Sequence, residues 1–208
     1  MPPYFQRESV KSFADVTITE AGVDTVEFLK AAEGVVGIFG ILNTPLLSPV
    51  SNDLGGNILK IRRRHDQTPE KSDTLENLVR NEMAEKRKEA TQGLLWLIRG
   101  LSFTCKAIQQ TQADPAKQLS TAFNESYADT LKPYHSFIVR PIFSAAMSGC
   151  PKREVLYDGL RKKEEHDEGE DATQEELDTV LNDWLEALAK IIARIDAFYE
   201  ANNYKKGL

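Results

Sequence analysis

One segment of the 208-residue sequence combines side chains that could bind a ligand with several hydroxyl groups. Asp53, Asn57 and Lys60 are spaced so that, on a helix turning about 100° per residue, they share one face. They offer carboxylate acceptors, an amide that both donates and accepts, and a cationic donor, which suits a sugar ring. Gly55 and Gly56 leave room beside them for a bulky ligand. The alternative interpretation is an ordinary polar helix face that continues into the basic run behind it.

An indole and an imidazole are the next candidates. Trp96 lies in the most apolar helical pattern of the chain, and Gly100 follows one turn later. Space beside an aromatic plane suits stacking against the flat face of a sugar. His135 follows Tyr134 at the start of another apolar helical segment. The alternatives are a tryptophan packed in the core and a core histidine whose hydrogen bonds are satisfied internally.

The sequence lacks the usual patterns of catalysis and metal binding. No histidine follows a glutamate by three residues, and His-Glu-x-x-His does not occur. A Gly-x-Ser-x-Gly elbow and a Walker loop are also missing. The two cysteines, Cys105 and Cys150, fit no zinc spacing and no disulfide framework. We therefore expect a protein that is not an enzyme and that needs no metal or cofactor.

Composition and charge narrow the class of protein further. Lysine plus arginine total 26 and aspartate plus glutamate total 32, so the formal net charge is −6. An acidic chain is a poor partner for nucleic acid. No apolar run approaches the ~18 residues that span a bilayer, and the N-terminus lacks the basic and apolar regions of a secretory signal. We expect a cytoplasmic protein with reduced thiols and no nucleic-acid partner.

Helical periodicity dominates the chain, and period-two alternation never persists, which predicts an all-α protein. We expect one domain over residues 1–208, with residues 1–20 as a partly ordered N-terminal extension. Segments 43–50, 66–73 and 162–171 read as loops, and the acidic run in the last one lacks the alternating ligands of a calcium loop. The expected helices cover approximately 24–42, 51–65, 74–87, 89–110, 115–131, 133–148, 154–161 and 174–202.

Three glycines recur at a spacing of three in the first expected helix: Gly34, Gly37 and Gly40. They do not follow a strand, so they are not a dinucleotide-binding fingerprint. We expect them to permit close packing or to loosen the end of the helix.

Taken together, the motifs resemble the glycolipid transfer protein family. The resemblance rests on their order and wide separation, and it covers residues 21–208. The length and loop pattern are similar to the fungal branch associated with heterokaryon incompatibility. The motifs are Asp53-x-x-Gly-Asn57-x-x-Lys60, Trp96-Leu-Ile-Arg99-Gly-Leu, Tyr134-His135-Ser-Phe-Ile-Val, Ile195-Asp196-Ala-Phe-Tyr199-Glu and Tyr204-Lys205.

This resemblance implies two helical layers, with a sphingolipid headgroup site on the surface and an apolar pocket for the ceramide chains. The family's aspartate, asparagine and lysine hydrogen-bond the sugar and the ceramide amide. Its tryptophan stacks on the sugar, its histidine bonds the amide carbonyl, and a tyrosine near the C-terminus helps to cover the sugar. The matching positions are, in that order, Asp53, Asn57, Lys60, Trp96, His135 and Tyr204. The positions implied for the acyl-chain pocket are Ile38, Phe39, Leu42, Leu47, Val50, Phe103, Leu131, Phe143 and Met147.

Two positions depart from the family pattern. Phe137 stands where many animal members carry a tryptophan that touches the membrane, so we expect Phe137 to make a membrane contact of lower affinity. Leu47 replaces an aromatic residue at the pocket, which leaves the preferred chain geometry open.

The function implied by the resemblance is a monomeric, non-enzymatic carrier that transfers glycosphingolipids between membranes during transient contact with their surface. Two alternatives stay open. One is a ceramide-1-phosphate carrier, against which Trp96 and Asn57 argue. The other is a glycolipid sensor or adaptor that signals to a protein partner.

Overall fold

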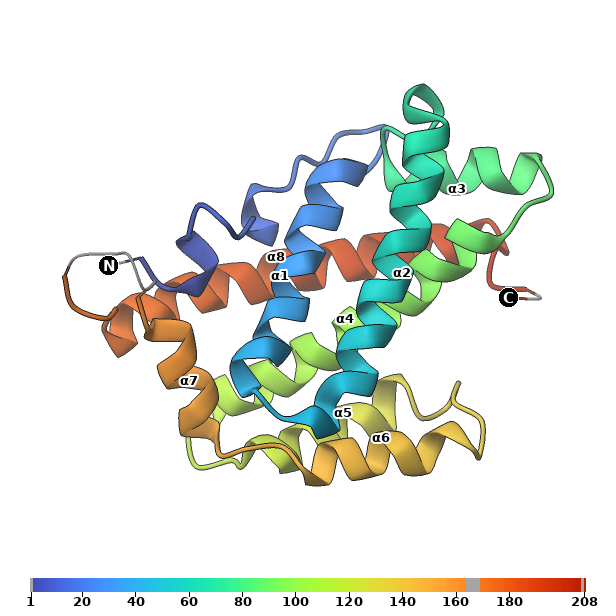
Figure 1. Ribbon diagram of the computed structural model, residues 1–208. Coiled ribbons are helices and arrows are strands. Elements are labelled where there is room, and N and C mark those ends of the chain that lie inside the picture. The colour runs from blue at the N-terminus through green and yellow to red at the C-terminus, as the bar shows by residue number, and fades with distance from the viewer. Residues whose placement is uncertain (1, 164–168, 207) are drawn as a thin grey trace.

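The computed structural model describes residues 2–163, 169–206 and 208, and this part of the chain consists of helices, turns and loops without a strand (Figure 1). It confirms the all-α class. The α-helices are α1 (Thr25–Leu42), α2 (Ser48–Gln67), α3 (Leu75–Ala84), α4 (Glu89–Ala113), α5 (Leu119–Thr130), α6 (Val139–Ser148), α7 (Arg153–Arg161) and α8 (Gln174–Ala201). Short 3-10 helices are η1 (Tyr4–Gln6), η2 (Phe13–Asp15), η3 (Pro45–Leu47) and η4 (Pro69–Lys71).

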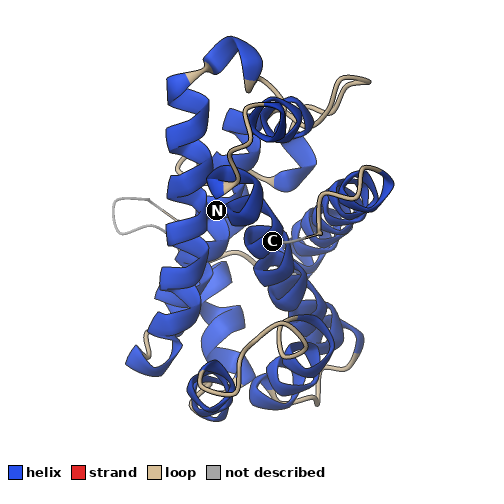
Figure 2. Ribbon diagram, turned by 90° about the vertical axis from the view of Figure 1, so that its right-hand side faces the viewer, coloured by secondary structure: helices blue, strands red, loops and turns tan. Residues whose placement is uncertain are grey.

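The helices form the two layers that the resemblance implies. α1 and α2 lie side by side and cross over α4 and α8 of the other layer (Figure 1). Figure 2, turned by 90°, shows helices on both sides of the core. α4 is the central element because it packs against α1, α2, α3, α5 and α8. Its side chains Leu97, Leu101 and Phe103 are completely buried. The site described below is built around this helix.

Side-chain caps define where several helices begin. The side chain of Asp24 accepts a hydrogen bond from the backbone N–H of Glu27 at 2.8 Å and starts α1. Thr173 and Glu176 form a capping box at the start of α8. Such caps satisfy backbone donors that have no partner within the helix.

Three helix starts differ from the expectation. α5 begins at Leu119 rather than near residue 115, because the N–H groups of Ala116 and Lys117 donate to Asp114 in a turn before the helix. α2 begins at Ser48 rather than near residue 51, because a proline in the first turn, here Pro49, loses no helical hydrogen bond. The helix expected from residue 133 begins only at Val139. The backbone N–H groups of Tyr134 and His135 both donate to the Leu131 carbonyl instead, at 3.0 and 3.1 Å. His135 therefore lies in a turn before α6.

The N-terminal segment packs on the helices. The rings of Phe5 and Phe13 lie 4.5 and 5.5 Å from that of Trp184 in α8. The Tyr4 hydroxyl donates to the Gly34 carbonyl at 2.8 Å and occupies the space that a Cβ at Gly37 would need. These two glycines thus permit close packing, as expected, with the N-terminal segment as the partner.

Part of the expected loop 162–171 cannot be compared with the structure, because residues 164–168 lie outside the described residues. No helix in the described part of the chain is both long enough and apolar enough to cross a membrane.

Candidate functional site

The polar residues of the first motif share one face in the middle of α2. The Lys60 Nζ donates to the Asn57 side-chain oxygen at 3.0 Å. Asn57 is 3% exposed, so this amide is held in one place by its surroundings. Burial raises the pKa of the Asp53 carboxyl, and the charge of Lys60 and a hydrogen bond with Asn57 partly oppose that rise.

Two glycines of α4 set the register between α2 and α4. A Cβ at Gly93 would lie 3.2 Å from the side chain of Lys60, and a Cβ at Gly100 would lie 2.7 Å from Leu54. Because these contacts lie on either side of Trp96 in the sequence of α4, the polar face of α2 runs alongside α4 at the level of Trp96. The prediction of open space beside Trp96 at Gly100 is wrong, because the Leu54 side chain fills that space. Open space is found at Gly55 and Gly56, as expected.

Trp96 belongs to a stack of four side chains. Its indole stacks on the His135 imidazole, with ring centroids 5.6 Å apart and planes 20° apart. The guanidinium carbon of Arg99 lies 4.9 Å from the centre of the Trp96 ring and 3.6 Å from that of Tyr134. Cation–π contacts of this kind hold both partners in place. The turn before α6 is therefore held on α4 by two contacts: His135 stacks on Trp96, and Tyr134 stacks on Arg99.

His135 is oriented by a neighbour that the sequence did not reveal. The Tyr127 hydroxyl lies 3.1 Å from Nδ1, and Arg140 donates to the His135 carbonyl at 3.0 Å. Burial, together with the charges of Arg140 and Arg99, lowers the pKa of His135, which favours the neutral ring. We assign Tyr127 as the donor to Nδ1, so the ring hydrogen resides on Nε2. His135 then offers one N–H donor to a carbonyl oxygen.

The nine positions implied for the acyl-chain pocket all lie in the core, and none is more than 6% exposed. A row of aromatic rings connects them with the polar end of the site. Phe143 lies 4.4 Å from His135 and stacks on Tyr127 at 5.6 Å. Phe123, whose ring the sequence did not single out, lies 5.1 Å from Phe103 and 6.2 Å from Phe39. Polar and apolar candidates therefore form one continuous region.

Tyr204 lies at the end of α8. Its ring is 5.6 Å from that of Phe198 and 6.4 Å from that of Tyr199, and it is half-buried. The adjacent Lys205 binds Asp196 at 2.7 Å and fixes this tail on α8. The structure thus places Tyr204 in the turn after α8, packed against the end of that helix, while the polar triad extends from α2.

An exposed apolar patch borders the site where the chain enters α6. Phe137 is 80% exposed and Ile138 is 65% exposed, and Tyr134 and Ile142 extend the same segment of apolar surface. We call these four residues the docking patch. Large apolar side chains that remain in water together typically mark a binding surface.

The described residues include no group of three or more histidine, cysteine, aspartate or glutamate side chains placed to hold a metal ion. What the site offers is hydrogen-bonding groups, an aromatic stack and an apolar interior.

Comparisons with known proteins agree with this architecture. The family model described as Glycolipid transfer protein (GLTP) matches residues 23–162. A glycolipid transfer protein of Aureobasidium melanogenum is 38% identical over 195 residues, covering 94% of this chain and 92% of the relative. The chain therefore belongs to the glycolipid transfer protein family.

Two solved structures have the same fold. The crystal structure of HET-C2, a fungal glycolipid transfer protein, aligns with a TM-score of 0.82 and 41% identity, covering 91% of this chain and 93% of that one. The structure that describes how FAPP2 selects simple glycosphingolipids using the GLTP fold aligns with a TM-score of 0.85 and 30% identity, covering 97% of both chains.

Proposed function

We propose that this chain binds glycosphingolipids and transfers them between membranes without making or breaking a covalent bond. The observation that carries the proposal is the continuity of the site. A polar face on α2 runs beside Trp96, Trp96 stacks on His135, and His135 contacts a row of rings that leads into the core. A lipid with a sugar headgroup, an amide and two apolar chains has these chemical groups in the same order.

The headgroup roles follow from the donors and acceptors available. Asp53, Asn57 and Lys60 would bind sugar hydroxyls, and Asp53 would also accept from the ceramide N–H. The Nε2–H of His135 would donate to the ceramide carbonyl, because its Nδ1 is occupied by Tyr127. Each buried polar atom that loses its partner costs about 1–3 kcal/mol, so these contacts select lipids that carry both a sugar and an amide.

The chain pocket explains why a carrier is needed. Each methylene exposed to water costs about 0.8 kcal/mol, so ceramide chains do not leave a membrane unaided. The nine buried pocket residues would offset this cost during transit. The pocket side chains pack on one another in this structure, so the hydrocarbon chains of the ceramide would have to push those side chains apart to enter. The docking patch would provide the transient membrane contact during loading, and the carrier would act as a monomer in the cytoplasm.

The cations around the site favour sugar over phosphate. Lys60 is bound to Asn57, and Arg140 is bound to the His135 carbonyl. A phosphate headgroup needs cations that converge on one point. Trp96 adds an aromatic face, which stabilises the C–H face of a sugar but not a phosphate. A ceramide-1-phosphate carrier is therefore the second candidate.

The test is transfer of a fluorescent monohexosyl ceramide from donor to acceptor vesicles, with the purified chain as the only protein. A carrier accelerates transfer in proportion to its concentration. Binding to the labelled lipid without transfer would contradict the carrier and support a sensor that acts through a protein partner. Native mass spectrometry of the purified protein then identifies any lipid that co-purifies.

A further inference from the structure

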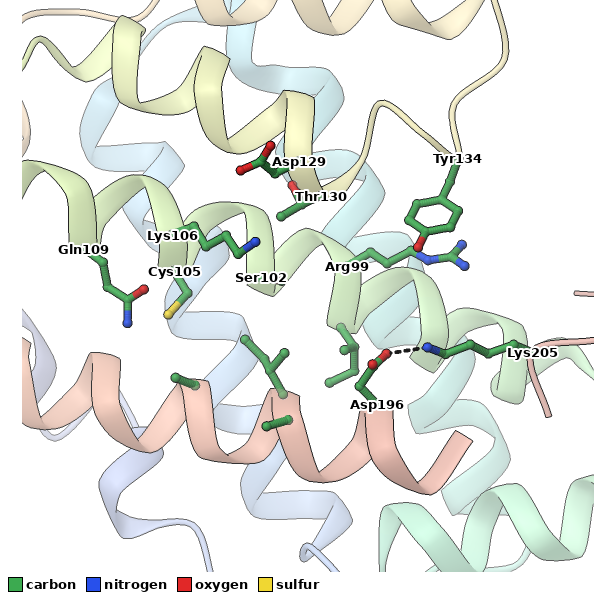
Figure 3. A pocket seen from close by; sticks show the side chains of 14 residues that line it. Arg99, Ser102, Cys105, Lys106, Gln109, Asp129, Thr130, Tyr134, Asp196 and Lys205 are labelled. Carbon is green, nitrogen blue, oxygen red and sulfur yellow. Dashed lines mark hydrogen bonds and ion pairs between the residues drawn. The ribbon is translucent and has the colours of Figure 1, made fainter. Parts of the chain in front are cut away.

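A groove between α4 and α8 lies next to the stack but is not part of the proposed sugar site. Its volume is about 360 Å³ (Figure 3). Ile98 of α4 and the small side chains of Ala189 and Ala193 of α8 provide an apolar lining. The polar lining includes Arg99, Ser102, Lys106, Thr130, Tyr134 and Lys205.

Arg99 presents unused hydrogen-bond donors to this groove. One face of its guanidinium lies on the Tyr134 ring at 3.6 Å, and the Trp96 ring is 4.9 Å away. Within the described residues, no hydrogen bond or ion pair engages its N–H groups. Burial lowers the pKa of Arg99, the sign of a charge that is partly removed from water. A stacked arginine with free N–H edges is suited to bind an oxyanion in a bidentate manner.

The other charges of the groove leave an excess of positive charge. Lys106 lies two turns beyond Arg99 on the same side of α4, about 10 Å along the helix. Within the described part of the chain, the Lys106 ammonium forms no ion pair. Three cations, Arg99, Lys106 and Lys205, line the groove with two carboxylates, Asp129 and Asp196. Lys205 pairs with Asp196 and with Glu200, at 2.7 Å each, and the charge of Asp196 also acts on Arg99. In Figure 3 the Lys106 side chain points along α4 toward Arg99, the Arg99 guanidinium lies beside Tyr134, and Lys205 is turned toward Asp196.

We propose that this groove binds a phosphate or sulfate group through Arg99 and Lys106, with the hydroxyl of Ser102 as a further donor. The site is distinct from the proposed sugar site and does not depend on it. The two are connected through Arg99, whose charge also faces the Trp96 ring. An anion bound to Arg99 would therefore change the surroundings of the indole.

The group can come from two sources with the same chemistry. One is a soluble phosphate compound. The other is the headgroup of an acidic membrane lipid, because Tyr134 belongs both to the groove and to the docking patch. The experiment has one arm for each source.

The first arm is an NMR titration of the full chain with inorganic phosphate at constant ionic strength, maintained with chloride. The two tryptophans give two indole N–H signals. Trp184 is 1% exposed and packs on Phe5 and Phe13, so its signal is the internal reference. We expect a saturable shift of the Trp96 signal alone. Arg99→Gln should weaken phosphate affinity at least tenfold.

Variants at two surface positions keep the test independent of the folding of the Arg99 variant. Lys106→Ala removes a cation and should lower the affinity several-fold, whereas Asp129→Asn removes one opposing carboxylate and should raise it. Both should transfer glycolipid normally in phosphate-free buffer, which separates this site from the proposed function. Affinities unchanged in both variants would overturn the proposal, and so would a shift that does not saturate together with no response in the second arm.

The second arm compares binding to phosphatidylcholine vesicles with and without phosphatidic acid. A gain in binding that Lys106→Ala abolishes identifies a membrane lipid as the source of the phosphate. Saturable binding of inorganic phosphate without this gain identifies a soluble compound. The absence of both responses rejects an oxyanion site in the groove.

Discussion

At the scale of single residues, the two groups expected at the ceramide amide provide the most direct test of the site. Asp53→Ala and His135→Leu each leave one amide atom without a partner in a partly desolvated place. The cost of about 1–3 kcal/mol corresponds to a loss of roughly fivefold to a hundredfold in affinity. We expect vesicle-to-vesicle transfer to fall accordingly, while far-UV circular dichroism retains the helical signal. Wild-type transfer rates in both variants would show that the site is assigned wrongly.

Trp96 distinguishes sugar from phosphate. Stacking on a sugar face is worth roughly 0.5–1.5 kcal/mol beyond the burial of area, by analogy with aromatic pairs. Trp96→Ala also loses the burial itself, so glycolipid affinity should fall at least tenfold, and Trp96→Phe should keep part of it. The measurement is competition between a monohexosyl ceramide and ceramide-1-phosphate with matched chains. Wild type should prefer the sugar lipid, and Trp96→Ala should narrow that preference. A preference for the phosphate lipid in wild type would favour the second candidate function.

The sequence predicted these residues better than it predicted their surroundings. Spacing along α2 was sufficient to put Asp53, Asn57 and Lys60 on one face, since helical geometry is local. Tyr127 and Arg99 could not be assigned roles, because their partners come from other segments and only the fold brings them together. The same reason explains the error at Gly100, where a side chain from α2 fills the space.

At the scale of elements, α6 and the turn before it should provide the membrane contact. Phe137 is the most exposed residue of the docking patch. Phe137→Ala should weaken binding to vesicles more than binding of a soluble, short-chain glycolipid, because the ring contacts lipid and not the bound headgroup. Val155→Ala on α7, which also removes an exposed apolar side chain, is the matched control. Equal losses in both assays would place Phe137 in the ligand site instead.

Helix existence was easier to predict than helix ends. The long amphipathic patterns of α4 and α8 identified both elements, since burial of an apolar stripe requires that periodicity. The start of α6 depended on a competition that the sequence does not reveal. The turn at 131–136 is stabilised by the Arg140 contact to the His135 carbonyl and by stacking on α4. Tertiary contacts of this kind override local helix propensity.

At the scale of the whole molecule, the core and the proposed chain pocket are the same region. The pocket residues belong to the hydrophobic core and lie between the layers, so loading would require parts of the fold to separate. η3 and α6 are suitable elements to move, since both carry pocket residues, Leu47 and Met147, and they pack on each other. The Leu46 side chain of η3 occupies the space that a Cβ at Gly149, the C-cap of α6, would need.

Joining η3 to α6 covalently should therefore block loading. A Cβ at Gly149 would lie 3.0 Å from the Leu46 Cβ, so a small shift gives the roughly 3.5–4.5 Å separation of a disulfide. We expect Leu46→Cys with Gly149→Cys, in a Cys150→Ser background, to take up long-chain glycolipid when reduced and to lose uptake when oxidised. The single variant Leu46→Cys is the control and should respond to neither condition. Because a short-chain glycolipid needs less separation of the layers, its binding should persist in the oxidised protein. Equal uptake of the long-chain lipid in both redox states would show that the chains enter elsewhere.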